Sequence, residues 1–361
     1  MRVGVSLPPM SANPNNPPYP SELPLAPPMV RYDRYRRKTV LPLLLFLATC
    51  LSTFFVGASK WSPIGPIGNS FVGHTWRDLL DIGSWDFFEI RILMLANWDT
   101  GLAYMFFVIL IIWLHEMGHF VATLIYRVPA SYPFFLPLPI NPIGTMGAVI
   151  AMHGHTADRK QIFDIGLAGP IAGLVAAIPI AWYGMAGFNI TIDIFRPLGE
   201  VKFQMPPLDL TTQAFGGIGF RLPLLMDWFA QWAEVPGYQT GDVVWLSQLN
   251  PMFVAGWVGM LITGLNMMPV GQLDGGHVTY TLFGKAAHWI AKGTMLFAIA
   301  FMVYYQTMMM ILMVVLLLLI GTEHPPTRDD KVPIGWFRWT IGLASLAIPV
   351  FCFPPRIFVI Q

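Results

Sequence analysis

The chain has 361 residues, of which 55% are hydrophobic and 11% are charged. Water-soluble domains carry about 25% charged residues, so this composition excludes the two or three soluble domains that the length alone would allow. Disordered, collagen-like and disulfide-scaffold classes are excluded for most of the chain as well. The net charge of +1 gives no electrostatic basis for binding nucleic acid. The class that remains is an all-α membrane protein that crosses the bilayer several times.

The N-terminal segment differs in composition from the rest of the chain. Nine of the 32 prolines fall within residues 1–29, which is typical of a disordered or polyproline-like tail. A basic cluster at 31–38 follows, and then a charge-free run from 39 to 59 that is long enough to span a bilayer. Lys and Arg beside a first span favour the cytoplasmic side. We therefore expect residues 1–38 to form a disordered, Pro-rich and basic cytoplasmic tail.

Further apolar runs predict six to seven transmembrane helices in total. The runs cover residues 102–126, 165–192, 243–273, 293–322 and 339–353, and the run 293–322 is interpreted as two spans joined by a tight hairpin. With the N-terminus inside, 14 of the 21 Lys and Arg residues fall in inner segments, as the positive-inside rule requires. The expected organisation is a first helix and outer loop at 39–100, a transmembrane core at 101–283 with an outer loop at about 187–242, and C-terminal helices at 284–361.

The run 102–126 contains the sequence His115-Glu116-Met117-Gly118-His119. Residues four apart lie on the same face of a helix, so both imidazoles can bind one zinc ion. Glu116 is then suited to take a proton from the metal-bound water. The alternative is a pair of packed histidines with a paired glutamate. Three ionisable groups inside an apolar span are expensive, however, and such groups usually mark a functional site.

A catalytic zinc site needs a third protein ligand and an open fourth position. Asp274 is the leading candidate, because it ends a long uncharged run on the same side of the membrane as the inner end of the histidine helix. Its alternative role is that of a helix cap. Asp164 is the rival ligand, but it precedes its apolar run and is typical of an N-cap or a first-turn acid.

Two motifs together resemble those of the site-2 protease family of intramembrane zinc metalloproteases, in the branch without a PDZ domain. They are His115-Glu116-x-x-His119 and Asn266-x-x-Pro269-x-x-x-Leu273-Asp274-Gly275. The run 165–192 adds Ala168-Gly169-Pro170, similar to the Gly- and Pro-rich core helix of that family. The resemblance covers roughly residues 101–283, which makes this segment the expected catalytic core with three core helices. The outer loop at about 187–242 is too short for a PDZ fold.

The resemblance implies one zinc ion per chain, bound by His115, His119 and Asp274. It implies that Glu116 is the catalytic base and that Asn266 contacts the substrate or stabilises the oxyanion. The activity it implies is hydrolysis, by Zn-activated water, of a peptide bond within or near a transmembrane segment of a membrane protein. The expected partners are the lipid bilayer and a transmembrane substrate such as a single-span regulator. The expected location is the cytoplasmic membrane of a prokaryote.

Residues 144–152 predict a short β segment at membrane level. They are too short for a span, begin with glycine and are rich in β-compatible residues. Cleavage requires the substrate helix to unwind, and its freed backbone then needs a partner where water is absent. We expect the strand to pair with the extended substrate by strand addition, with Gly144, Gly147, Val149 and Asn266 as substrate contacts. The alternative is a re-entrant coil that only packs, and four prolines between 133 and 142 predict an irregular loop before it.

Two other functions remain open on the sequence alone. A metal transporter would use the same histidines and carboxylate to line a pathway, but transporters often show internal repeats and none is found. A catalytically silent homologue would bind membrane proteins without cutting them, and the presence of Glu116 argues against it. His277, three residues after Asp274, either supports the metal ligands or only packs.

Overall fold

The computed structural model describes residues 39–63, 88–186, 218–245, 249–305, 321, 323–353 and 359–360. Within these residues, four helical segments are long and apolar enough to cross a membrane. They are α1 (Val40–Ala58), α4 (Trp98–Tyr126), α5 (Arg159–Ala186) and the segment Gly335–Cys352, which comprises α11 (Gly335–Ser345) and α12 (Ile348–Cys352). The chain is therefore a mostly helical membrane protein. The second half of the run 293–322, which carries one of the expected spans, lies outside the described residues.

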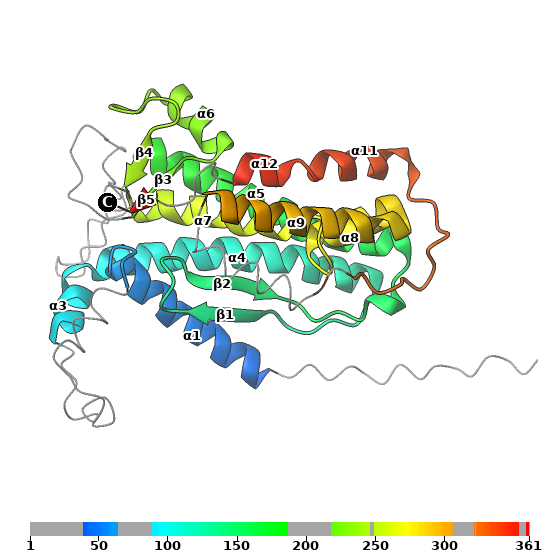
Figure 1. Cartoon of the computed structure of the whole chain (residues 1–361). Coiled ribbons are helices and arrows are strands. Elements are labelled where there is room, and N and C mark those ends of the chain that lie inside the picture. The colour runs from blue at the N-terminus through cyan, green and yellow to red at the C-terminus, as the bar shows by residue number, and fades with distance from the viewer. Residues whose placement is uncertain are drawn as a thin grey trace, which may run out of the picture. The chain divides into compact units, whose positions relative to one another are not determined.

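The helices α4, α5 and α7 (Pro251–Asn266) pack against one another at the centre of the bundle (Figure 1). Small residues allow this close approach: a Cβ on Gly256 of α7 would lie 2.5 Å from the backbone nitrogen of Ala181 of α5. Phe107 of α4 and Trp257 of α7 belong to the same buried apolar cluster. Because lipid is as apolar as these side chains, close packing is the main attraction between the helices. This packing fixes the positions of the polar side chains that the helices carry.

A β-hairpin lies beside α1 and α4 (Figure 1). It consists of β1 (Phe134–Leu138) and β2 (Gly144–Val149), which pair antiparallel. The strand predicted within 144–152 is present as β2. The prediction of an irregular loop before it is wrong, because residues 134–138 form the strand β1. The strand β1 includes Pro137, and its register shifts between Phe135 and Pro137, because a bulge accommodates a residue that has no N–H.

Two hydroxyl groups attach the hairpin to the neighbouring helices. The Ser52 hydroxyl of α1 donates to the Gly144 carbonyl at 2.6 Å. The Tyr104 hydroxyl of α4 donates to the Ile143 carbonyl at 2.8 Å. These bonds give two carbonyl groups of the hairpin a hydrogen-bond donor in an apolar environment.

The run 243–273 is not one continuous span. Its apolar helix α7 begins at Pro251, after Asn250 caps it by accepting the Phe253 N–H at 2.8 Å. The helix ends at Asn266, and the Pro- and Gly-containing turn 267–273 leads into α8 (Asp274–Phe283). A Cβ on Gly275 would overlap the Met267 carbonyl, so this turn folds tightly against the first turn of α8. Asp274 is consequently the first residue of a helix rather than the end of one.

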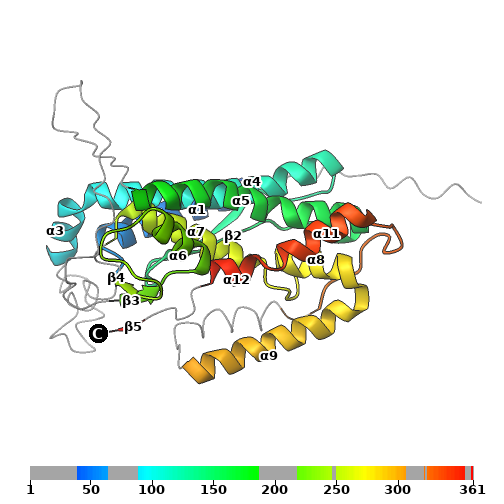
Figure 2. The same ribbon diagram turned by 90° about the horizontal axis from the view of Figure 1, so that it is seen from above.

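The remaining described elements form two sets. One set comprises α3 (Phe88–Ala96), β3 (Ile218–Arg221), α6 (Leu224–Trp232), β4 (Val243–Trp245) and β5 (Val359–Ile360), with the sheet order β4-β3-β5. The other comprises the short 3-10 helices η3 (Gly154–Thr156) and η5 (Gly284–Ala286) and the helix α9 (Ala287–Tyr305). Figure 2 shows α9 packed beside α8, away from α5. Residues 187–217 of the expected outer loop lie outside the described residues.

A bidentate ion pair ties α11 to the core. Arg338 of α11 donates from Nε to Asp164 Oδ1 at 2.8 Å and from Nη2 to Asp164 Oδ2 at 3.0 Å. The Tyr126 hydroxyl at the end of α4 donates to the same carboxylate. Three helices therefore meet at Asp164, which lies in the first turns of α5.

Replacing Arg338 by Ala should lower the free energy of unfolding by about 1 kcal/mol, at the upper end for partly exposed ion pairs because the geometry is bidentate. Arg328→Ala is the matched control, since Arg328 makes a single 3.5 Å contact to Asp158 and is more exposed. Thermal unfolding in detergent, followed by tryptophan fluorescence, measures both. A larger loss of unfolding free energy for Arg328→Ala than for Arg338→Ala would contradict the stabilising role of the Arg338–Asp164 ion pair.

Candidate active site

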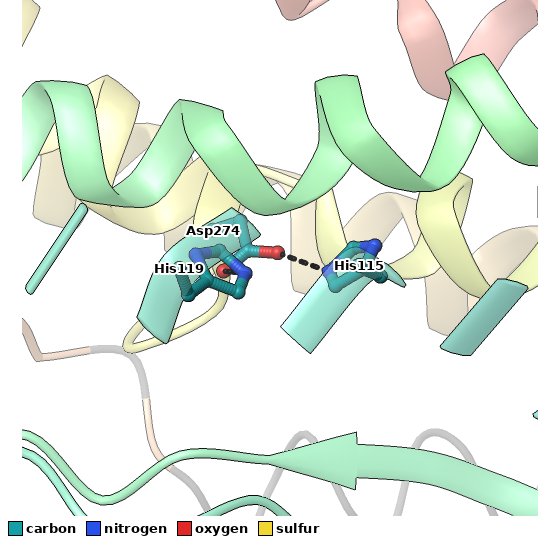
Figure 3. Close-up of side chains that lie close together, drawn as sticks. All are labelled: His115, His119 and Asp274. Carbon is teal, nitrogen blue, oxygen red and sulfur yellow. Dashed lines mark hydrogen bonds and ion pairs between the residues drawn. The ribbon is translucent and has the colours of Figure 1, made fainter. Parts of the chain in front are cut away.

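The histidines of α4 lie side by side on its buried face. His115 is 2% exposed and His119 is 9% exposed, and their ring centroids are 5.1 Å apart. Positions four apart in a helix share one face, which is why the sequence spacing brings both imidazoles together. Both rings point towards the first turn of α8 (Figure 3).

Asp274 of α8 meets both rings. Its Oδ2 lies 3.2 Å from His115 Nε2, and its Oδ1 lies 3.2 Å from His119 Nε2. One ligand atom from each of the three residues lies within 4.8 Å of the other two. Asp164, the other candidate for the third ligand, forms an ion pair with Arg338 instead. The fold thus brings Asp274, and not Asp164, to the two histidines.

Hydrogen bonds set the imidazoles in a form that suits a metal ion. His119 Nδ1 lies 2.7 Å from the Ile165 carbonyl, which can only accept, so Nδ1 carries the proton and Nε2 keeps a free lone pair. Asn266 Nδ2 lies 3.3 Å from His115 Nε2, and an amide N–H there can donate to a lone pair on that nitrogen. With both Nε2 atoms unprotonated, two nitrogens and a carboxylate converge as acceptors, an arrangement that suits a cation. Two histidines and a carboxylate are also a ligand set of catalytic zinc sites.

Glycines of α5 make room for both rings. A Cβ on Gly169 would overlap the His119 imidazole at Nε2, the atom that faces Asp274. A Cβ on Gly173 would lie 2.8 Å from His115 Nδ1. These positions leave space for the two imidazole rings.

Glu116 lies in the wall of a pocket that opens at these residues. Glu116 is 3% exposed. The same wall contains His119, Asp274 and Asn266, and the β2 end of the hairpin contributes Ala148, Val149 and Ile150. A carboxylate beside the converging ligands can accept a proton from a water molecule that they help to position.

The residues predicted to bind substrate fall in two places. Val149 and Asn266 line the pocket. Gly144 lies outside the lining and packs against α1, where a Cβ would lie 3.0 Å from Thr53 Cα. Gly147 also lies outside the lining, with a φ of 91° that a side chain would disfavour. Sequence reasoning missed His324, because no spacing links it to the other site residues; its Nε2 lies 2.6 Å from Nδ1 of the pocket residue His277.

Comparison with known proteins gives one family and several relatives. The model of peptidase family M50 matches residues 103–315. "Probable zinc metalloprotease EGY1, chloroplastic" of Oryza sativa subsp. japonica is 31% identical over 69% of this chain and 38% of its own length. The Arabidopsis thaliana protein of the same name is 32% identical over 52% of this chain and 31% of its own length. The chain thus spans less than two-fifths of the length of these relatives. No solved structure matches it.

Proposed function

The chain belongs to peptidase family M50, and we propose that it is an intramembrane zinc metalloprotease of the site-2 type. It would hydrolyse a peptide bond within or near a transmembrane segment of a membrane protein. The observation that carries the proposal is the convergence of His115, His119 and Asp274 beside Glu116, within apolar helices. Ionisable groups at such a depth are retained for function. The zinc metalloprotease names of the relatives support the same chemistry.

We assign each residue one task in the reaction. His115, His119 and Asp274 would hold one zinc ion, which when bound supplies Lewis acidity for the activation of water and of the scissile carbonyl. Glu116 takes the proton of the attacking water and delivers it to the departing amine. Asn266 directs its amide N–H at the oxygen on which negative charge develops. Its present contact with His115 Nε2 would open when that nitrogen binds the ion.

The strand β2 supports a way of holding the substrate. A helix that unwinds in hydrocarbon exposes backbone groups that need partners. Within the described residues β2 pairs with β1 on one edge only, and Val149 at its end lines the pocket and is 52% exposed. We propose that the unwound substrate pairs with the free edge of β2. Gly144 and Gly147 would then shape the strand, and Val149 and Asn266 would contact the substrate.

The proposed substrate is a transmembrane protein, for example a single-span regulator. We propose that the basic segment at 31–38 lies in the cytoplasm and that the membrane is the cytoplasmic membrane of a prokaryote. The distribution of Lys and Arg supports the orientation. The relatives are named as chloroplastic, so a plastid membrane is the competing location. Fractionation with protease protection of an N-terminal tag tests both points.

Purified protein in liposomes, mixed with a single-span test protein, tests the activity. Cleavage should require zinc and should stop when a chelator removes the ion. Mass spectrometry of the fragments should place the cut within or near the transmembrane segment. Zinc movement across the membrane without cleavage would contradict the proposal and favour a metal transporter.

Replacing Asp274 by Asn tests the ligand set. The variant should lose both bound zinc and cleavage, because an amide is a much weaker ligand than a carboxylate at this position. Asp164→Asn is the matched control, and it should keep its zinc although it weakens the tie to Arg338. Metal analysis by mass spectrometry measures the zinc content of both. Zinc loss in Asp164→Asn with zinc retained in Asp274→Asn would overturn the assignment.

A further inference from the structure

His277 of α8 connects the pocket to a second histidine. It lies one turn after Asp274 and lines the same pocket. Its Nδ1 lies 2.6 Å from Nε2 of His324, a residue that precedes α11 and is 9% exposed. The two rings meet edge to face, with centroids 4.8 Å apart. The pair does not belong to the group of converging ligands around Asp274.

The hydrogen bonds of His324 fix where each proton lies. His324 Nδ1 lies 2.6 Å from the Pro325 carbonyl, so this nitrogen is the donor. Burial lowers the pKa of the His324 imidazole to about 4, so the ring is neutral near pH 7 and its Nε2 is a bare acceptor. The shared proton must therefore sit on His277 Nδ1.

His277 consequently presents a bare nitrogen on its other side. Burial, with a smaller contribution from the His324 ring, lowers the pKa of the His277 imidazole to about 3. A neutral ring with its proton on Nδ1 has a free lone pair on Nε2. That atom is the hydrogen-bond acceptor that His277 can offer in the pocket.

The segment that carries His324 is held firmly against α8. The His324 ring stacks on Tyr280 of α8, with centroids 4.2 Å apart and planes 13° apart. The Tyr280 hydroxyl donates to Asp330 Oδ2 at 3.0 Å. Arg159 of α5 donates from Nε to the Thr281 carbonyl at 2.7 Å and from Nη1 to the Asp330 carbonyl at 3.4 Å. These contacts leave the His324 ring little freedom, which is the condition for orienting another imidazole.

An extended substrate needs partners on both of its edges. A strand has N–H and C=O groups on each side, and pairing with β2 would satisfy one side only. The pocket wall contains Val149 of β2 together with His277 and Gln272 near the start of α8, so a peptide bound there has polar side chains within the same cavity. An unpaired N–H in an apolar site is costly, and a bare imidazole nitrogen is a suitable partner for it.

We propose that Nε2 of His277 accepts a hydrogen bond from a backbone N–H of the unwound substrate, and that His324 is a positioning residue that sets the tautomer and orientation of His277. The proposal rests on the proposed protease function. It adds a substrate contact on α8 to the pairing with β2, and it gives the segment before α11 a role in substrate binding.

Variants of both histidines test two roles separately: that of His277 Nε2 as the hydrogen-bond acceptor and that of His324 in positioning the His277 ring. His277→Asn keeps an N–H near the position of Nδ1 but offers nothing at Nε2, and it should lower kcat/KM about 10-fold, mainly through KM. His324→Leu removes the acceptor for His277 Nδ1 and should lower kcat/KM by a similar factor. His324→Gln places an amide oxygen near the position of Nε2 and should restore kcat/KM to within about 3-fold of wild type. Zinc content should be unchanged in all three.

Synthetic substrates test the contact with the peptide itself. In a synthetic transmembrane segment, one amide at a time near the cut is replaced by an ester, which has no N–H. At one position the ester should lower kcat/KM about 10-fold with wild type and have no further effect with His277→Asn. If every ester lowers kcat/KM equally in both enzymes, or if His324→Leu behaves like wild type, the proposal is overturned.

The same experiments distinguish this inference from the protease function. Wild-type protein that binds zinc but cuts no segment contradicts the protease function. Wild-type cleavage that is matched by His277→Asn at equal KM overturns the inference alone. Zinc loss in His277→Asn also overturns it, because His277 would then act on the metal site rather than on the substrate.

Discussion

Replacing Glu116 by Gln should lower the rate of substrate cleavage by about 10²–10⁴-fold while the bound zinc stays at the wild-type level. Glu116 lines the pocket, yet it is not one of the three converging ligands. Gln has nearly the same size, so the packing around this buried position is preserved. An amide cannot take a proton from water, so the chemical step alone is lost. Cleavage in liposomes and metal analysis of the same samples measure the two properties together.

The outcome separates the protease from the two other functions. Zinc in both proteins with cleavage by wild type alone assigns Glu116 as the base. Equal cleavage by both proteins would contradict that assignment. Zinc in both proteins with no cleavage of any single-span test protein would favour a catalytically silent homologue. Zinc transport by both at the same rate would favour a transporter, because a pathway needs ligands but no general base.

Local patterns in the sequence predicted much of the site. The spacing of His115 and His119 requires only that the run 102–126 is helical, and the run is long and apolar apart from the group His115, Glu116 and His119, which predicts a helix. Asp274 could be singled out because carboxylates at membrane depth are few. The structure brings the three side chains together, although 159 positions separate His115 from Asp274. The ends of α1 and α4 also follow the apolar runs closely.

Features that depend on tertiary contacts were missed. The strand β1 forms through Pro137 because a bulge and the neighbouring β2 accommodate it, and neither is visible in a local pattern. The run 243–273 is uncharged throughout, and hydropathy alone does not show that α7 ends at Asn266. His324 lies 47 positions from His277, with no periodicity to link them. Only the folding of the segment before α11 against α8 brings these two rings into contact.

Replacing Gly169 by Ala should remove zinc and cleavage together. Gly169 belongs to α5, and a Cβ there would overlap His119 Nε2, the atom that faces Asp274. His119 cannot easily yield, because its Nδ1 bonds to the Ile165 carbonyl of the same helix α5. Loss of supporting contacts alone weakens metal affinity by about 10–100-fold. Displacement of a ligand should exceed this range, so we expect zinc binding at least about 100-fold weaker.

The matched control is Gly293→Ala in α9, where an added Cβ meets no described atom within 4 Å. Alanine is the better helix former, so this variant should fold and keep its zinc and activity. Competition with a zinc chelator measures the affinity of both variants, and circular dichroism checks their helix content. If Gly169→Ala retains wild-type zinc affinity, the His119 imidazole can be displaced by the added Cβ without loss of zinc binding. His119 would then not be a ligand, and the metal centre would have to be rebuilt from other residues.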